Sequence, residues 1–119
     1  MRYKFRAWDE NNEVMEYGVN IDNGRPVKEG YQLYHKGNTV YHSQPMQYTG
    51  LVDVNGVEIY EGDIITSEDN FNKGKLVYRY GCFQIKYGRE KYKLLINTAY
   101  PKVIGNIYQH KHLLKESEK

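Results

Sequence analysis

The fold is decided by one stretch of sequence, MQYTGLVDVNGVEIYEGDII, which spans residues 46–65. Apolar and polar residues alternate on both sides of Asn55-Gly56. This pair predicts a β-hairpin with a type I′ turn, because both central positions of that turn need positive φ. Glu61-Gly62-Asp63 predicts a second turn before the extended run at Ile64-Ile65. The stretch therefore indicates short strands joined by tight turns.

The N-terminal residues continue this β pattern. Residues 3–8 alternate and predict a half-buried strand, with Trp8 on the same face as two basic residues. Residues 13–17 are expected to pair back on that strand. A variable loop or insert is expected near residues 20–45, where turn residues are frequent, and a hairpin within residues 31–42 is plausible there.

The C-terminal part predicts further strands. A three-stranded meander is expected over residues 75–80, 82–87 and 91–96. Residues 103–108 predict a final strand that a glycine interrupts. Residues 110–114 are compatible with one helical turn, and the tail 115–119 is expected to fray.

Length and composition favour one folded domain over residues 1–119. A chain of 119 residues can bury one hydrophobic core. Its 13 tyrosines allow a folded core although only 39% of the residues are hydrophobic, because a tyrosine ring buries apolar area while its hydroxyl reaches a polar partner. Many short strands with frequent turns predict a mostly β fold, either a small barrel or a pair of packed sheets.

The single cysteine, Cys82, excludes an intramolecular disulfide and a metal site built on paired cysteines. This fits a reducing compartment. The sequence shows neither the apolar run of a signal peptide nor the roughly 20 apolar residues of a membrane helix. We therefore expect a soluble protein in the cytoplasm of its cell, with no membrane partner.

Charge is distributed unevenly along the chain. Residues 1–70 contain six Lys and Arg against twelve Asp and Glu, a net charge of −6. Residues 71–119 contain eleven Lys and Arg against three Asp and Glu, a net charge of +8. The basic half suggests a face for nucleic acid. Mutual neutralisation of two interleaved halves is the alternative that we favour, because no nucleic-acid-binding motif is present.

Three blocks of the sequence resemble the YopX-like family of phage and prophage proteins. They are residues 4–9, residues 46–64 and residues 103–108, in that order. The resemblance implies a small SH3-like, YopX-like barrel or pseudo-barrel of short antiparallel strands, with at most one or two short helical turns. It also implies a bacteriophage or prophage origin in a bacterial host. It does not point to any particular activity.

The residues that carry this structural signature are Trp8, Tyr48, Gly50, Asn55, Gly56, Ile59, Tyr60, Gly62, Asp63, Gly105 and Asn106. The chain departs from the family pattern at its tail, where Gln109-His110-Lys111-His112 precedes Leu113-Leu114. This tail is more basic than is usual in the family.

Few residues suggest catalysis or metal binding. Glu58, Glu61 and Asp63 are close in sequence and could serve as acid and base or bind a divalent cation. A structural role in turns is favoured, because Asp commonly accepts hydrogen bonds from local backbone N–H groups. Cys82 is interpreted as a strand residue and not as a nucleophile.

The histidines offer a second candidate for metal binding. His110 and His112, together with His35 or His42, could form a zinc site. No third ligand stands at a recognisable spacing, so solvent-exposed histidines are favoured. We therefore predict no catalytic residue, no metal site and no cofactor.

The strongest functional pattern is a basic, tyrosine-rich stretch. The candidate partner surface comprises Lys75, Tyr78, Arg79, Lys86, Tyr87, Arg89, Tyr92 and Lys93, with Tyr80 and Lys91 in the same stretch. Tyrosine and arginine are enriched at protein interfaces, whereas aromatic rings beside lysines also suit single-stranded nucleic acid.

These patterns favour a non-enzymatic phage accessory protein that binds a protein partner. Nucleic-acid binding, single- or double-stranded, is the second hypothesis, and a metal-dependent enzyme is a distant third. Formation of a homo-oligomer stays open.

Overall fold

The chain folds into two structural units. The computed structural model describes residues 4–22, 25–28, 31–32, 43–67 and 72–115. The first unit is Met1–Tyr48 and the second is Thr49–Lys119.

Eleven strands and two short helical segments form within the described residues. The first strands are β1 (Phe5–Asp9), β2 (Val14–Asp22), β3 (Arg25–Lys28), β4 (Tyr31–Gln32) and β5 (Met46–Val52). They are followed by β6 (Glu58–Tyr60), β7 (Asp63–Thr66), β8 (Lys73–Arg79), β9 (Cys82–Tyr87) and β10 (Lys91–Leu94). The chain ends with the 3₁₀ segment η1 (Leu95–Asn97), β11 (Lys102–Asn106) and α1 (His112–Lys115).

The strands form two antiparallel sheets. One has the order β4-β3-β2-β1-β5-β6 and the other the order β10-β9-β8-β7-β11. The mostly β prediction is thereby confirmed. Within the described part of the chain the sheets are open and not closed into a barrel, since each strand order has two ends.

The first unit departs from its sequence pattern in two places. Four consecutive residues of β1 are buried, namely Arg6, Ala7, Trp8 and Asp9. The alternating sequence pattern predicted that one face of this strand would be exposed to solvent. β1 is a central strand between β2 and β5, and the Arg6 guanidinium lies 6.0 Å from the centre of the Tyr17 ring.

The expected loop near residues 20–45 is partly a hairpin. β2 reaches Asp22 and pairs with β3, for example through Asn20 and Val27. The sequence pattern did not predict this hairpin, because its strands contain polar residues and a proline, and apolar and polar residues do not alternate regularly along them. Residues 33–42, with most of the second expected hairpin, lie outside the described residues.

The turn at Asn55-Gly56 is real but is not of type I′. Gly56 has a φ of +80°, whereas Asn55 is not among the residues with positive φ. The Asp53 carboxylate explains the difference, because its Oδ1 accepts hydrogen bonds from the N–H groups of Asn55 (2.8 Å) and Val57 (2.9 Å). These bonds hold an Asx-type turn in which Gly56 alone needs the left-handed region.

A turn with the type I′ pattern occurs instead between β8 and β9. Tyr80 and Gly81 are its two central residues, with φ values of +53° and +79°. Arg79 and Cys82 pair on either side of it. Positive φ at both positions matches the right-handed twist of the flanking strands, so this hairpin sets the register of β8 against β9.

Asp53 also links distant parts of the second unit. Its Oδ2 accepts a hydrogen bond of 2.9 Å from the N–H of Val103 in β11, and the neighbouring N–H of Val54 donates to the carbonyl of Pro101. Burial acts to raise the pKa of Asp53, but the hydrogen bonds from Val103, Val57 and Asn55 and the charge of Lys102 together lower it below its ordinary value.

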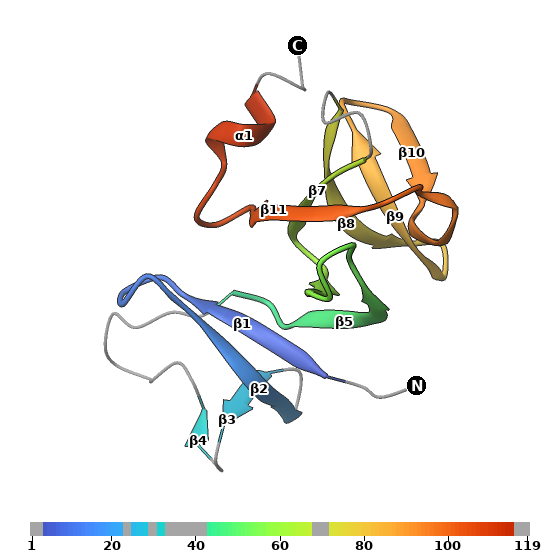
Figure 1. The fold of residues 1–119 in the computed structure, drawn as a ribbon. Helices are drawn as coiled ribbons and strands as arrows, with labels where there is room; N and C mark the ends of the chain where they lie inside the picture. Colours follow the sequence, from blue (N-terminus) through green and yellow to red (C-terminus); the bar gives the residue numbers. More distant parts are fainter. Residues whose placement is uncertain (1–3, 23–24, 29–30, 33–42, 68–71, 116–119) are drawn as a thin grey trace. The chain divides into compact units, whose positions relative to one another are not determined.

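The core of the second unit is aliphatic. Its fully packed members are Ile59, Ile65, Leu76, Ile85 and Leu95, and Phe83, Tyr87 and Val103 pack against them. Figure 1 shows β8, β9 and β10 as successive neighbours in this unit. The tyrosines of this unit differ in burial: Tyr60 is buried, whereas Tyr78, Tyr80 and Tyr100 are exposed.

Gly74 allows β8 and β9 to approach closely. A Cβ at this position would lie 2.6 Å from the Lys86 carbonyl oxygen. The remaining boundaries shift by a few residues: the strand expected over 91–96 ends at Leu94 and continues as η1, and the helical turn expected over 110–114 is α1.

Several signature residues have structural roles. Gly50 and Gly62 have φ values of +89° and +84°, and Asp63 Oδ2 accepts a 2.8 Å hydrogen bond from the N–H of Tyr60 across the turn.

Asn106 Oδ1 accepts hydrogen bonds from the N–H groups of Tyr108 and Gln109. Gly105 gives room for the ring of His110, whose Cγ would lie 2.6 Å from an added Cβ.

Trp8, Ile59 and Tyr60 are buried. Tyr48 is half-buried and lies 4.9 Å from the ammonium of Lys4.

Replacing Gly56 with Val tests the turn. We expect the free energy of unfolding to fall by about 1 kcal/mol or more, because a β-branched residue resists positive φ, while an added Cβ would meet no atom within 4 Å. Gly56→Asn is the control, since Asn tolerates this region better. Equal urea midpoints for Val and Asn variants would contradict the positive φ.

Asp53→Asn tests the carboxylate. An amide nitrogen facing Val103 cannot accept its hydrogen bond, so the free energy of unfolding should fall by about 1–3 kcal/mol at pH 7. Because folding lowers the pKa of Asp53, its contribution is complete above the unfolded pKa of about 4 and is lost as pH falls through the folded pKa. Urea unfolding at several pH values should therefore show a weaker acid dependence in Asp53→Asn than in the exposed control Glu10→Gln.

Candidate binding surface

Strands β8, β9 and β10 form the meander that carries the candidate surface. Lys75 pairs with Lys86 across β8 and β9, and Lys86 pairs with Tyr92 across β9 and β10. Paired residues lie on the same face of an antiparallel sheet, and side chains alternate between faces along each strand. The register therefore assigns every side chain of the meander to one of two faces.

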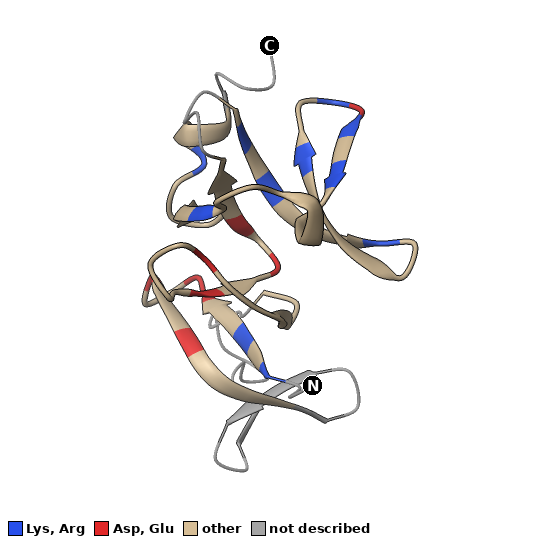
Figure 2. Ribbon diagram, turned by 45° about the vertical axis from the view of Figure 1, so that its right-hand side comes forward, with Lys and Arg blue, Asp and Glu red and all other residues tan. Residues whose placement is uncertain are grey.

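One face of the meander is basic. It carries Lys73, Lys75, Arg79, Lys86 and Tyr92, and we call these five residues the basic face. Val77, Gln84 and Leu94 lie between them on the same side. Figure 2 shows Lys and Arg recurring along these strands.

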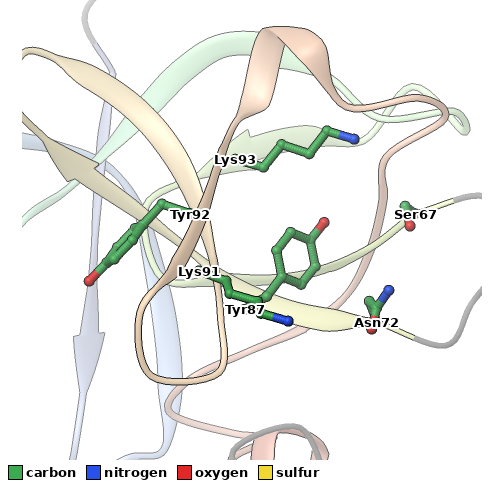
Figure 3. A pocket seen from close by; sticks show the side chains of 6 residues that line it. All are labelled: Ser67, Asn72, Tyr87, Lys91, Tyr92 and Lys93. Carbon is green, nitrogen blue, oxygen red and sulfur yellow. The ribbon is translucent and has the colours of Figure 1, made fainter.

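The opposite face contributes to the core. Leu76, Phe83, Ile85 and Tyr87 project from it, and Lys91 and Lys93 pair with Tyr87 and Ile85 at its margin. Figure 3 shows Tyr87 and Tyr92 on opposite sides of β10.

The eight predicted surface residues therefore do not form one surface. Lys75, Arg79, Lys86 and Tyr92 lie together on the basic face. The other face carries Tyr78, Tyr87 and Lys93, and Arg89 is in the turn between β9 and β10. Sequence reasoning missed Lys73, which follows from Lys75 by the two-residue period of a strand.

Arg79 and Tyr92 are stacked. The guanidinium carbon of Arg79 lies 3.4 Å from the centre of the Tyr92 ring and 4.7 Å from that of Tyr80. The Arg79 carbonyl accepts a 2.9 Å hydrogen bond from the side-chain amide of Gln84. Cation–π contact holds the Arg79 head against the sheet, so one face of the Tyr92 ring is already covered.

Lys75 and Lys86 are like charges placed directly opposite each other. Such a cross-strand pair is destabilising by some tenths of a kcal/mol. Among the described residues no carboxylate pairs with either ammonium, and residues 73–93 contain seven Lys and Arg against Glu90 alone. The basic face therefore has a positive potential that an external anionic group would relieve.

The other candidate residues are placed as follows. Asp63 is engaged by the backbone of Tyr60, and the Tyr60 hydroxyl is 3.5 Å from Glu58. Cys82 begins β9 and its thiol lies 3.6 Å from the Tyr80 carbonyl. Among the residues that the structure describes, no three His, Cys, Asp or Glu side chains are grouped to hold a metal ion.

His110 has a structural contact. Its Nδ1 accepts a 3.1 Å hydrogen bond from the N–H of Asn106, and its ring centre is 6.2 Å from that of His112. His35 and His42 lie outside the described residues. No helix in the described ranges is long and apolar enough to cross a membrane.

The model of the family described as YopX protein matches residues 4–115. The crystal structure of protein EF1440 from Enterococcus faecalis is similar, with 25% identity, a TM-score of 0.63, and coverage of 97% of this chain and 99% of that chain. Protein yopX from Bacillus subtilis resembles the fold at 24% identity and a TM-score of 0.53, covering 97% and 98% of the two chains. No curated protein matches the sequence significantly.

Lys86→Glu tests the opposed lysines. We expect the free energy of unfolding to rise by about 0.2–1 kcal/mol, because repulsion from Lys75 becomes attraction. Lys86→Gln should give an intermediate value, since it removes the repulsion without adding a charge. Chemical denaturation at low salt measures the order of stability, and a Lys86→Glu protein less stable than Lys86→Gln would contradict the pairing of Lys75 with Lys86.

Proposed function

This chain belongs to the YopX protein family, and we propose that it is a non-enzymatic binding module whose basic face meets an acidic surface of a partner protein. The phage or prophage setting, and action in the cytoplasm of a bacterial host, belong to the same proposal. They rest on the resemblance of the sequence blocks and on the lone Cys82.

The opposed pair Lys75 and Lys86 is the observation that carries the proposal. A sheet gains nothing in stability from two like charges held side by side. A carboxylate of a partner placed between the two ammonium groups would remove the repulsion and add two charge-assisted hydrogen bonds. The same side chains that weaken the free protein would thus strengthen the complex.

The remaining residues of the basic face suit a protein partner. Arg79 is ordered by its stack on Tyr92, so less side-chain entropy is lost when it binds. Val77 and Leu94 add apolar area between the charged groups. Ordered tyrosine and arginine beside small apolar patches are typical of protein interfaces.

Nucleic acid is the second candidate, and one observation favours it. Tyr80 is 85% exposed and lies beside Arg79, so a base could stack on it while the arginine meets a phosphate. The protein candidate ranks first because the Tyr92 ring, the aromatic residue of the basic face, already has Arg79 over its face.

Photo-crosslinking tests the proposal. A photoreactive residue in place of Lys73 is introduced into the full chain, which is expressed in the bacterial host and irradiated. We expect a crosslinked protein, which is then purified and titrated with the unmodified chain, with Lys86→Glu and with Lys111→Glu. The two variants change net charge equally, but Lys111 is exposed and outside the basic face.

Lys86→Glu should weaken binding about tenfold or more, and Lys111→Glu by about twofold or less. Equal losses in the two variants would reject the basic face as the contact. A crosslink that nuclease removes, together with salt-dependent binding of single-stranded oligonucleotides, would replace the protein partner with nucleic acid.

A further inference from the structure

A pocket of about 390 Å³ borders the edge strand β10. Its walls are Ser67, Asn72, Tyr87, Lys91, Tyr92 and Lys93. Three of its wall residues, Tyr87, Lys91 and Lys93, lie on the face of the sheet opposite the basic face, whereas Tyr92 belongs to the basic face. Ser67 directly follows β7 and Asn72 directly precedes β8. The pocket therefore lies at the margin of the core face, where edge strand β10 and the ends of two other strands contribute side chains.

Two ammonium groups flank one aromatic ring in this pocket. Figure 3 shows the Lys91 and Lys93 side chains on either side of the Tyr87 ring, on the side where Ser67 and Asn72 lie. Lys91 and Lys93 are two residues apart and share a face, which separates their backbones by roughly 6.5 Å. Flexible lysine side chains can converge from that distance on one phosphate or carboxylate group.

Edge protection is the simpler explanation of these lysines. β10 ends its sheet, and lysines on edge strands discourage pairing with other chains. That explanation accounts for the presence of lysines on β10. It does not account for their position on one face of the sheet, because lysines on either face would protect the edge. Both lysines share the face of Tyr87 and border a pocket with two further polar side chains.

The volume and the chemistry of the walls indicate the class of ligand. A pocket of about 390 Å³ is within the size range of small-molecule sites and is larger than an inorganic anion needs. Tyr87 packs against the core cluster, so its ring is a fixed wall for a planar group. Ser67 and Asn72 supply hydrogen-bonding groups for the polar edge of such a group.

We propose that this pocket binds a nucleoside monophosphate unit, with the phosphate between Lys91 and Lys93 and the base or sugar against Tyr87. The unit is either a free nucleotide or the 5′-phosphorylated end of a nucleic-acid strand, since both present the same chemistry. The two lysines of this site are separate from the basic face, because residues 91 and 93 project from the other side of the sheet; Tyr92 borders both.

Calorimetric titration of the full chain with AMP, adenosine and inorganic phosphate tests the site. We expect saturable binding of AMP at low salt and at least tenfold weaker binding of both adenosine and phosphate, because each lacks half of the contacts. Lys91→Gln and Lys93→Gln should each weaken AMP binding about tenfold, as expected for the loss of one charge-assisted contact. Asn72→Ala should weaken it by less.

Lys86→Gln is the matched control. It removes one positive charge from the same meander but from the basic face, so AMP affinity should change by about twofold or less. An equal loss in Lys86→Gln and Lys91→Gln would overturn the pocket in favour of diffuse attraction. Equal affinity for phosphate and AMP would reduce the site to a simple anion site, and no saturable AMP binding at millimolar concentration would reject it.

Short oligonucleotides separate the two sources of the ligand. A 5′-phosphorylated strand that binds more tightly than both AMP and its 5′-hydroxyl counterpart identifies a strand end, whereas AMP binding equal to or tighter than the phosphorylated strand identifies a free nucleotide. If neither AMP nor the strands bind, the proposed pocket site is rejected. The proposed protein partner of the basic face is not affected by that result, because Lys91 and Lys93 do not belong to the basic face.

Discussion

The second unit depends on one carboxylate, which accepts hydrogen bonds from backbone N–H groups of two segments that are distant in sequence. Asp53 holds its own turn through Asn55 and Val57 and holds β11 through Val103. β11 pairs with β7, which pairs in turn with β8. The sheet that presents the basic face and the pocket is therefore anchored, strand by strand, to a buried charge whose hydrogen bonds outweigh the desolvation that opposes it.

Local chemistry made much of this fold predictable from sequence. Alternation identified β8 and β9, and Gly56 and Gly62 have the positive φ that their turn positions suggested. The long-range bond from Val103 to Asp53 spans 50 residues, and no local pattern reports such a contact. The prediction of a type I′ turn at Asn55-Gly56 was wrong for a local reason: the dipeptide suits that turn, but the preceding Asp53 carboxylate accepts hydrogen bonds from Asn55 and Val57 and so decides the geometry.

Composition and register contribute differently to the candidate site. The sequence pointed to strands β8, β9 and β10, because lysine, arginine and tyrosine are concentrated over residues 73–93. It did not separate Lys86 from Tyr87, although neighbouring residues of a strand face opposite sides. Ser67 and Asn72 gave no signal at all, since an isolated serine or asparagine beside a strand is common; only the spatial arrangement brings them to Lys91 and Lys93.

The aliphatic core explains how the meander tolerates its charge. Ile65, Leu76 and Ile85 supply hydrophobic burial without needing polar partners, so Tyr78, Tyr80 and Tyr100 can remain exposed. If the tyrosines formed the core, their hydroxyls would need hydrogen-bond partners inside the protein. Fewer tyrosine rings would then lie beside lysines and arginines at the surface. Aliphatic residues thus supply the burial that stabilises this sheet, which leaves Tyr78 and Tyr80 exposed beside the cations of the meander.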